Sequence, residues 1–408
     1  MSNPENRTPL GKGSYGTVEY RDGLAVKTFT RISHLVQEYL ALRYLRDTKY
    51  IVKARDVDFT RLEMSMDLCS YNVRQWIETK WNQAQAQILV ADVLKGLIEL
   101  HERGLAHGDL KPGNILVVDS DGQFTGLLGD CGFVSVAKHA KVNKCAPAYR
   151  EKKISRSWRH DMYSFGICLI NITTRTFPNV NKLDYAGVID HVNSKVSNRI
   201  HREILFNLLS ENKKTRMSAR QVYDALFGIK VGIIPVYNNS LNNIPNSFTS
   251  PSSPSGPNEM IPKGVESLSG DSNSPTSTES KKIRILDEDH FSESSGSNKT
   301  LHPKHREQIR AWLKANSRVN EIKRGNKGYG LLVYFLQDRE IEVKYYHLYM
   351  GVTLLILSST FGKRSLKLED IMTLTKNKYD VNMIIAGLES VLDDDIFVDK
   401  IMVRSHHE

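Results

Sequence analysis

The sequence has few cysteines and no long apolar run. Only four of its 408 residues are cysteine, and none forms a Cys-x-x-Cys pair. Such sparse cysteines argue against a disulfide framework or a zinc site and predict free thiols in a reducing compartment. The longest apolar run, residues 348–357, is about half of what a membrane-spanning helix needs, and the polar start lacks a signal-peptide core. We therefore expect an intracellular protein, in the cytoplasm or the nucleus, without membrane contact.

Composition divides the chain into three parts, since its length exceeds what one ordinary core accommodates. Residues 8–228 alternate strand-like and helix-like patterns, which predicts an α+β domain. Residues 237–300 are rich in Ser, Pro and Asn and cannot bury enough apolar surface to fold, so we expect a disordered linker. Residues 303–408 return to helical periodicity and predict an all-α domain.

A glycine-rich turn joins the first two expected strands between Leu10 and Val18, and it contains Gly11, Gly13 and Gly16. Without side chains, the backbone N–H groups of such a turn can approach phosphates closely. A second strand follows, whereas a dinucleotide-binding fold would need a helix there. A purely structural hairpin remains the alternative interpretation.

A lysine and a glutamate follow at positions suited to pairing. Lys27 ends the apolar strand 24–27, and Glu38 lies in the expected helix 32–45. An ammonium group oriented by a carboxylate can hold two phosphates. A solvated strand end is the alternative interpretation of the lysine.

The strongest motif is the run His-Gly-Asp-Leu-Lys-Pro-Gly-Asn at residues 107–114. Here the sequence resembles the eukaryotic protein kinase family, in its serine/threonine branch because Lys111 precedes a proline. The resemblance implies a bilobal fold with a small β-rich N-lobe and a helical C-lobe, and ATP and Mg²⁺ as cofactors. It implies that Asp109 accepts the proton of the substrate hydroxyl and that Lys111 neutralises the transferring phosphate.

The same resemblance assigns the remaining site residues. Asn114 would hold magnesium together with Asp130, which lies in a Gly-Asp-Cys-Gly version of the Asp-Phe-Gly element. Lys27 and Glu38 would form the ion pair that positions ATP, and Asp161 would brace the catalytic loop. The expected nucleotide site comprises Leu10, Gly11, Gly13, Gly16, Val18, Lys27, Asp67 and Cys69.

Three departures from the family concern regulation and substrate binding. Gly108 replaces the arginine that binds a phosphorylated activation loop, and Ser135 is the only hydroxyl residue between Cys131 and Cys145. The glutamate of the Ala-Pro-Glu element is missing. Either Glu151 replaces it through a local shift, or its expected partner Arg216 is exposed.

Basic residues gather beside the expected substrate groove. A solvated face is the plain interpretation of such a cluster, and a preference for acidic or phosphorylated protein substrates is the functional one. We do not expect nucleic-acid binding, because aromatic residues are not interleaved. The cluster is Lys138, Lys141, Lys144, Arg150, Lys152, Lys153, Arg156 and Arg159.

The C-terminal part reads as five helices, with 345–359 apolar all round as a central helix should be. Ser365 and Asp380 are the expected N-caps of the last two helices. The order of residues 350–359, 368–375 and 384–397 resembles a single cyclin box, in which Thr360 replaces the expected lysine and Glu389 matches its partner. A generic helical dimerisation or docking domain is the alternative. The expected spans are 305–315, 329–336, 345–359, 366–374 and 381–392.

A cyclin-like domain suggests a mode of regulation. Cyclins press on the helix that carries the glutamate, and a flexible linker of roughly 65 residues spans about 45 Å, which permits contact within one chain. We therefore expect a serine/threonine protein kinase that is activated in cis. The alternative function is a pseudokinase or cyclin-fold scaffold that recruits partners or another kinase.

Overall fold

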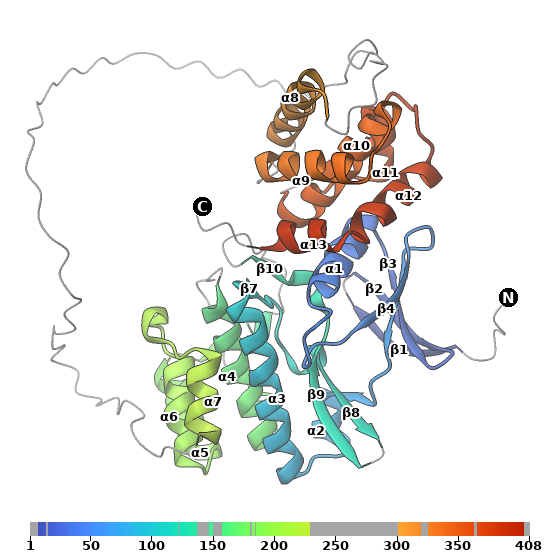
Figure 1. Cartoon of the computed structure of the whole chain (residues 1–408). Coiled ribbons are helices and arrows are strands. Elements are labelled where there is room, and N and C mark those ends of the chain that lie inside the picture. Colours follow the sequence, from blue (N-terminus) through green and yellow to red (C-terminus); the bar gives the residue numbers. More distant parts are fainter. Residues whose placement is uncertain are drawn as a thin grey trace, which may run out of the picture. The chain divides into compact units, whose positions relative to one another are not determined.

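The computed structural model describes most of the chain outside the predicted linker (Figure 1). The prediction of a disordered linker at 237–300 concerns residues outside the described ranges. The described ranges are 7–13, 15–120, 122–136, 147–149, 157–179, 182–183, 185–228, 301–319, 325–362 and 365–403.

The N-lobe is an antiparallel sheet with one helix. Its strand order is β1-β2-β3-β5-β4, and the tight turn between β2 and β3 sets Arg21 opposite Leu24. Helix α1 contacts β3, β4 and β5 and carries Glu38. The elements are β1 (Thr8–Gly13), β2 (Gly16–Arg21), β3 (Leu24–Phe29), α1 (Ile32–Tyr44), β4 (Ala54–Asp58) and β5 (Glu63–Asp67).

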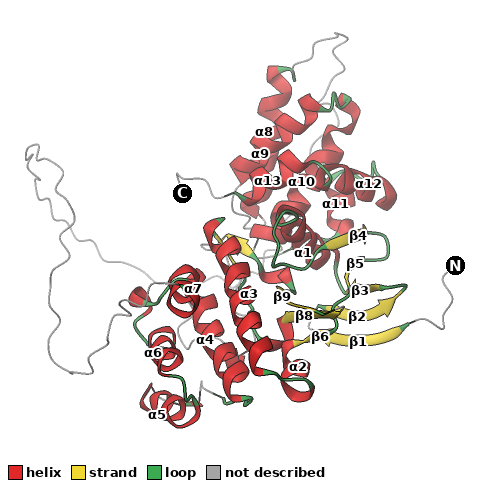
Figure 2. Cartoon of the chain, turned by 60° about the horizontal axis from the view of Figure 1, so that its bottom comes forward, coloured by secondary structure: helices red, strands yellow, loops and turns green. Residues whose placement is uncertain are grey.

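The C-lobe is mainly helical, and Figure 2 shows its helices apart from the N-lobe strands. The C-lobe also contains small antiparallel sheets, whose strand orders are β6-β8-β9 and β10-β7. The strands are β6 (Tyr71–Asn72), β7 (Leu105–Ala106), β8 (Ile115–Ser120), β9 (Gln123–Leu128) and β10 (Ser135–Val136). The helices are α2 (Val73–Thr79), α3 (Gln83–Glu102), α4 (Trp158–Thr174), α5 (Tyr185–Lys195), α6 (Arg199–Leu208) and α7 (Ala219–Phe227), with 3-10 turns at Pro112–Asn114, Cys131–Phe133, Pro147–Tyr149 and Lys213–Thr215.

Polar N-caps fix where these helices begin. The Asn82 side chain accepts hydrogen bonds from the backbone N–H groups of Ala84 and Gln85 at the start of α3. Ser218 and Gln221 form a reciprocal capping box at the start of α7. Such caps satisfy N–H groups that have no partner inside the helix.

The C-terminal part is all-helical, as predicted. Each of the five expected helices is present, and a sixth, α13, follows them. Asp380 caps α12 through Met383 N, but the predicted cap Ser365 is wrong: α11 begins after Lys367, whose N–H donates to Asp370. The helices are α8 (Pro303–Val319), α9 (Gly325–Asp338), α10 (Tyr346–Phe361), α11 (Leu368–Leu374), α12 (Val381–Leu392) and α13 (Asp395–Met402), with a 3-10 turn at Val343–Tyr345.

Helix α10 is the centre of this helical part. It contacts α8, α9, α11 and α12, and nearly all of its residues are buried. Trp312 and Leu313 of α8 are buried as well. The Thr360 hydroxyl donates to Ile356 O within α10, whereas Glu389 is exposed. Among the described residues, every helix is too short or too polar to span a bilayer.

Two helix-interior glycines offer a matched test of this packing. A Cβ at Gly351 in α10 would lie 2.7 Å from Ile371 Cγ2, whereas a Cβ at Gly330 in α9 would meet nothing within 4 Å. We expect Gly330→Ala to raise the free energy of unfolding by up to about 1 kcal/mol through helix propensity. Gly351→Ala should lower it by about 1–3 kcal/mol through overpacking. Urea unfolding of the full chain measures both, and a stabilising Gly351→Ala would contradict the packing described for α10.

Candidate active site

Lys27 lies between two carboxylates. Its Nζ is 2.7 Å from Glu38 Oε2 and 2.9 Å from Glu38 Oε1, and 2.8 Å from Asp130 Oδ1. Lys27 and Glu38 are 8% and 2% exposed. Strand β3 supplies the lysine, α1 the glutamate, and the loop after β9 the aspartate. The predicted Lys27–Glu38 pair is formed. Lys27 is buried, whereas the alternative interpretation required a lysine exposed to solvent at the end of its strand.

Burial and charge act against each other in this group. Burial alone would lower the pKa of Lys27, but the carboxylates of Glu38 and Asp130 outweigh it and hold that pKa above its ordinary value. Burial would raise the pKa of Asp130, but Lys27 holds it below the ordinary value. Lys27 is therefore cationic and Asp130 anionic at neutral pH, so the ammonium group can attract phosphate and the carboxylate can attract a metal cation.

The loop after β7 brings three predicted residues together. Lys111 Nζ lies 2.5 Å from Asp109 Oδ2. Asn114 Nδ2 donates to Asp109 O at 2.8 Å and to Asp109 Oδ2 at 3.1 Å. Asp109 is 4% exposed. Its carboxylate is therefore oriented by an ammonium group and an amide, and a substrate hydroxyl that reached it would meet a fixed acceptor.

Asp161 braces this loop from α4, as the resemblance implied. Its carboxylate accepts hydrogen bonds from the N–H groups of His107 at 2.8 Å and Gly108 at 2.9 Å. His101 Nε2 lies 3.0 Å from the same carboxylate. Burial raises the pKa of Asp161, but His101 and these hydrogen bonds hold it below its ordinary value. The buried anion thus fixes the backbone that leads into Asp109.

The residues predicted to hold magnesium fit such an ion. Asp130 offers a carboxylate and Asn114 an amide oxygen, and Mg²⁺ prefers oxygen ligands of this kind. The amide nitrogen of Asn114 donates to Asp109. The amide oxygen of Asn114 therefore faces away from Asp109. Asp130 has a left-handed backbone, with φ 53°, and its side chain reaches Lys27.

The predicted nucleotide-site residues between Leu10 and Val18 belong to the two strands that precede the strand of Lys27. Leu10, Gly11 and Gly13 lie in β1, while Gly16 and Val18 lie in β2. A Cβ at Gly16 would come within 1.9 Å of Thr28 O, so the sheet itself requires this glycine. The structural interpretation of the glycine-rich turn therefore explains Gly16 and leaves Gly11 and Gly13 without a packing reason.

The last two residues of the predicted nucleotide site, Asp67 and Cys69, lie at the end of β5 and just after it. Asp67 is the last residue of that strand, its N–H donates to Lys53 O, and its side chain pairs with Arg55. Cys69 follows and is half-buried, and burial raises the pKa of its thiol to about 11. This thiol is therefore protonated at neutral pH. Cys131 and Cys168 are free and buried thiols.

The glycine that stands in place of arginine at position 108 has a structural role. Gly108 has φ +83°, and a Cβ there would lie 3.1 Å from Phe133 O and 3.3 Å from Phe133 Cβ. A side chain at this position would be strained and crowded. The glycine therefore lets the segment after Asp130 approach the catalytic loop, a role that the sequence alone did not reveal.

Arg216 is not exposed, contrary to one of the two alternatives for it. It is 3% exposed, and its guanidinium donates to Arg159 O at 2.7 Å and Ser210 O at 2.9 Å. It also lies over the Tyr163 ring, 5.3 Å from the centroid. Glu151, the predicted substitute partner, falls outside the described residues.

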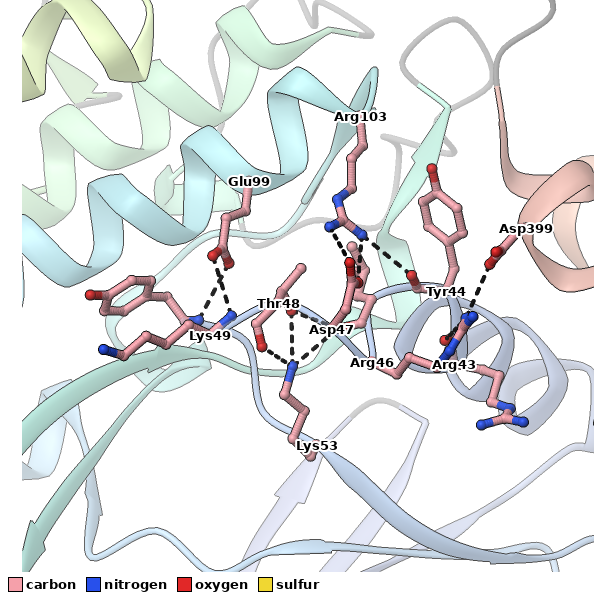
Figure 3. A network of polar contacts seen from close by, with 12 residues as sticks. Arg43, Tyr44, Arg46, Asp47, Thr48, Lys49, Lys53, Glu99, Arg103 and Asp399 are labelled. Carbon is pink, nitrogen blue, oxygen red and sulfur yellow. Dashed lines mark hydrogen bonds and ion pairs between the residues drawn. The ribbon is translucent and has the colours of Figure 1, made fainter. Parts of the chain in front are cut away.

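A polar network anchors the loop after α1 to the C-lobe helix α3 (Figure 3). Arg103, the C-cap residue of α3, binds Asp47 through two hydrogen bonds of 2.8 Å. Glu99 of α3 accepts from the N–H groups of Lys49 and Tyr50 at 3.2 and 3.3 Å. The C-terminal end of the helix that carries Glu38 is thereby tied to the lobe that carries Asp109.

Comparison with known proteins agrees with this geometry. The protein kinase domain family model matches residues 5–227. Serine/threonine-protein kinase stk11 of Xenopus laevis is 26% identical over 52% of this chain and 58% of its own length. Mitogen-activated protein kinase 14 of Xenopus laevis is 28% identical over 45% and 58%, and mitogen-activated protein kinase pmk-1 of Caenorhabditis elegans is 30% identical over 44% and 54%. The chain thus spans a little over half the length of these relatives. Since the family model covers more than half of this chain, the chain belongs to the protein kinase family.

Proposed function

We propose that this chain is an ATP-dependent serine/threonine protein kinase whose catalysis resides in residues 8–228. The observation that carries the proposal is Lys27 held between Glu38 and Asp130, together with an Asp109 carboxylate that is oriented by Lys111 and Asn114. A pseudokinase would be expected to lack at least one of these groups. The matched serine/threonine kinases support the choice of substrate hydroxyl.

The residues divide the reaction among them. Lys27 binds ATP phosphates, and Asp109 accepts the proton of a serine or threonine hydroxyl as its oxygen attacks the γ-phosphorus. The bond from that phosphorus to the bridging oxygen breaks, and ADP leaves. Lys111 offsets negative charge beside Asp109. Magnesium, held by Asn114 and Asp130, neutralises the phosphate charge when bound.

Asp109→Asn tests this assignment, because asparagine keeps the size of the side chain but cannot accept the proton. We expect kcat for phosphate transfer from radiolabelled ATP to fall about 100-fold or more, with the affinity for ATP within about twofold of wild type. Asp119→Asn, on the exposed end of β8, is the matched control and should keep wild-type kcat. Equal activity of Asp109→Asn and wild type would contradict the assignment, and an inactive wild type would favour the scaffold function.

We further propose that the C-terminal helical domain activates the kinase in cis by holding α1. Arg43 Nη2 lies 3.0 Å from Asp395 Oδ1, and Arg46 Nη1 lies 3.0 Å from Asp399 Oδ1. Asp395 and Asp399 belong to α13, and α1 also contacts α10. These ion pairs support the proposal, because Arg43 lies near the end of the helix that carries Glu38 and Arg46 lies just after that helix. Figure 3 shows the pair of Arg46 with Asp399.

Helix geometry connects this contact with the active site. Arg43 follows Glu38 by five positions in α1, which places the two side chains about 140° apart around the helix axis. A partner on the arginine side therefore restrains the helix without blocking the face that meets Lys27. The arginines and aspartates are 30–49% exposed, so each pair contributes at most about 1 kcal/mol and weakens with salt.

Charge reversal tests activation in cis. We expect Arg43→Glu/Arg46→Glu to lower kcat about three- to tenfold, because like charges then face α13. Adding Asp395→Arg and Asp399→Arg should restore most of the activity. Arg199→Glu removes an exposed ion pair of α6 instead and should have no effect. Unchanged activity of the first variant, or failure of the added reversals to rescue it, would contradict the proposal.

A preference for acidic substrates is also proposed from charge. Most of the basic cluster between residues 131 and 160 falls outside the described residues, although Arg159 is described at the start of α4. A library of serine peptides with acidic, neutral or basic flanks measures the preference. We expect the acidic set to have the highest kcat/KM and to lose its advantage at about 1 M salt. An equal or higher value for the basic set would contradict the preference.

A further inference from the structure

Three aromatic rings meet where the glycine-rich turn faces α1. The ring centroids of Tyr15 and His34 are 4.3 Å apart, and the ring planes meet edge to face at an angle of 67°. The Tyr15 ring also contacts the Phe133 ring, at a centroid distance of 5.3 Å. Rings at these separations attract one another beyond the area they bury. Tyr15 comes from the turn between β1 and β2, His34 from α1, and Phe133 from the segment after Asp130.

The backbone strengthens this contact. The N–H of Thr30, two residues before α1, donates to Tyr15 O at 3.0 Å. The turn is thus fixed to the start of α1 by its main chain, and the Tyr15 ring reaches further to Phe133. The connection runs from the turn expected to cover ATP phosphates to the residues that surround Asp130.

Phe133 is also in contact with the catalytic loop. It is 8% exposed, and its backbone passes so close to Gly108 that a Cβ there would be crowded. Cys131 occupies the position where the family has phenylalanine, and it is fully buried next to α1. The nearest phenylalanine therefore lies two residues further on, where it meets the glycine-rich turn.

The Tyr15 phenol lies near both catalytic carboxylates. Burial and the charges of Asp109 and Asp130 raise its pKa to about 12. The phenol is therefore neutral at physiological pH, so it adds no negative charge where the phosphates of ATP would bind.

We infer that Tyr15 and Phe133 are positioning residues that hold the glycine-rich turn closed over ATP and couple it to α1 and Asp130. The inference rests on the proposed kinase function. The ring of Tyr15, and not its hydroxyl, carries the effect, since the contacts with His34 and Phe133 are ring contacts. The two residues act as one unit because they touch each other.

The test measures the KM for ATP and kcat of full-length variants, together with the Kd of a fluorescent ATP analogue. We expect Tyr15→Ala and Phe133→Leu each to raise the KM and the Kd about fivefold, with kcat nearly unchanged. Tyr15→Phe should stay within about twofold of wild type. The KM and the Kd of the double variant should not exceed the larger of the values found for the two single variants, because the two residues share one contact. Tyr20→Ala, near the far end of β2, is the control and should leave the KM unchanged.

Several results would overturn the inference. An equal loss in Tyr15→Phe and Tyr15→Ala would assign the effect to the hydroxyl. A lower kcat at unchanged KM would show only a smaller folded fraction, and multiplicative effects in the double variant would show independent residues. If the wild type transfers no phosphate, the proposed function fails, but the Kd values still decide whether Tyr15 and Phe133 hold the nucleotide.

Discussion

The buried contact of Lys27 with Glu38 and Asp130 is the interaction on which the active site depends. A charge removed from water is costly unless it is paired, and here one cation is shared by two carboxylates that come from different elements. The contact exists only when α1 packs against the sheet and the loop after β9 reaches the same point. The position of α1 therefore controls whether the charged groups of the site face one another.

Helix α1 is restrained from several directions. The Asp47–Arg103 pair ties the loop at its C-terminal end to the end of α3, and the proposed activation in cis adds the pairs of Arg43 and Arg46 with α13. At its other end, His34 and Thr30 contact Tyr15. Exposed ion pairs of this kind are individually weak. Their combined effect is to narrow the positions available to the helix.

The sequence predicted the parts of the site that depend on local motifs. The residues from His107 to Asn114 and around Asp130 could be located because their spacing serves one chemistry, and the structure brings them together. The catalytic roles assigned to them, and the cyclin-like nature of the C-terminal domain, stay predictions. The periodicity of α10 was enough to identify a central helix, because it is apolar all round.

Contacts between distant segments could not be predicted in this way. Arg46 and Asp399 are far apart in sequence, and the same is true of Tyr15 and Phe133, so neither pair leaves a local pattern. Helix α13 was missed because its start is rich in aspartate, which resembles a loop, although Asp394 in fact caps it. Arg216 is buried, contrary to the alternative that left it exposed, and its hydrogen bonds to the backbone carbonyls of Arg159 and Ser210 also leave no local pattern.

We expect phosphate transfer to depend on the Glu38 carboxylate, which holds Lys27 in place. The most direct test is the kcat of Glu38→Gln in the full chain, measured with radiolabelled ATP, because glutamine preserves size but removes the charge. We predict a loss of about tenfold or more with a circular dichroism spectrum like that of wild type. Wild-type kcat in a folded Glu38→Gln protein would contradict the account.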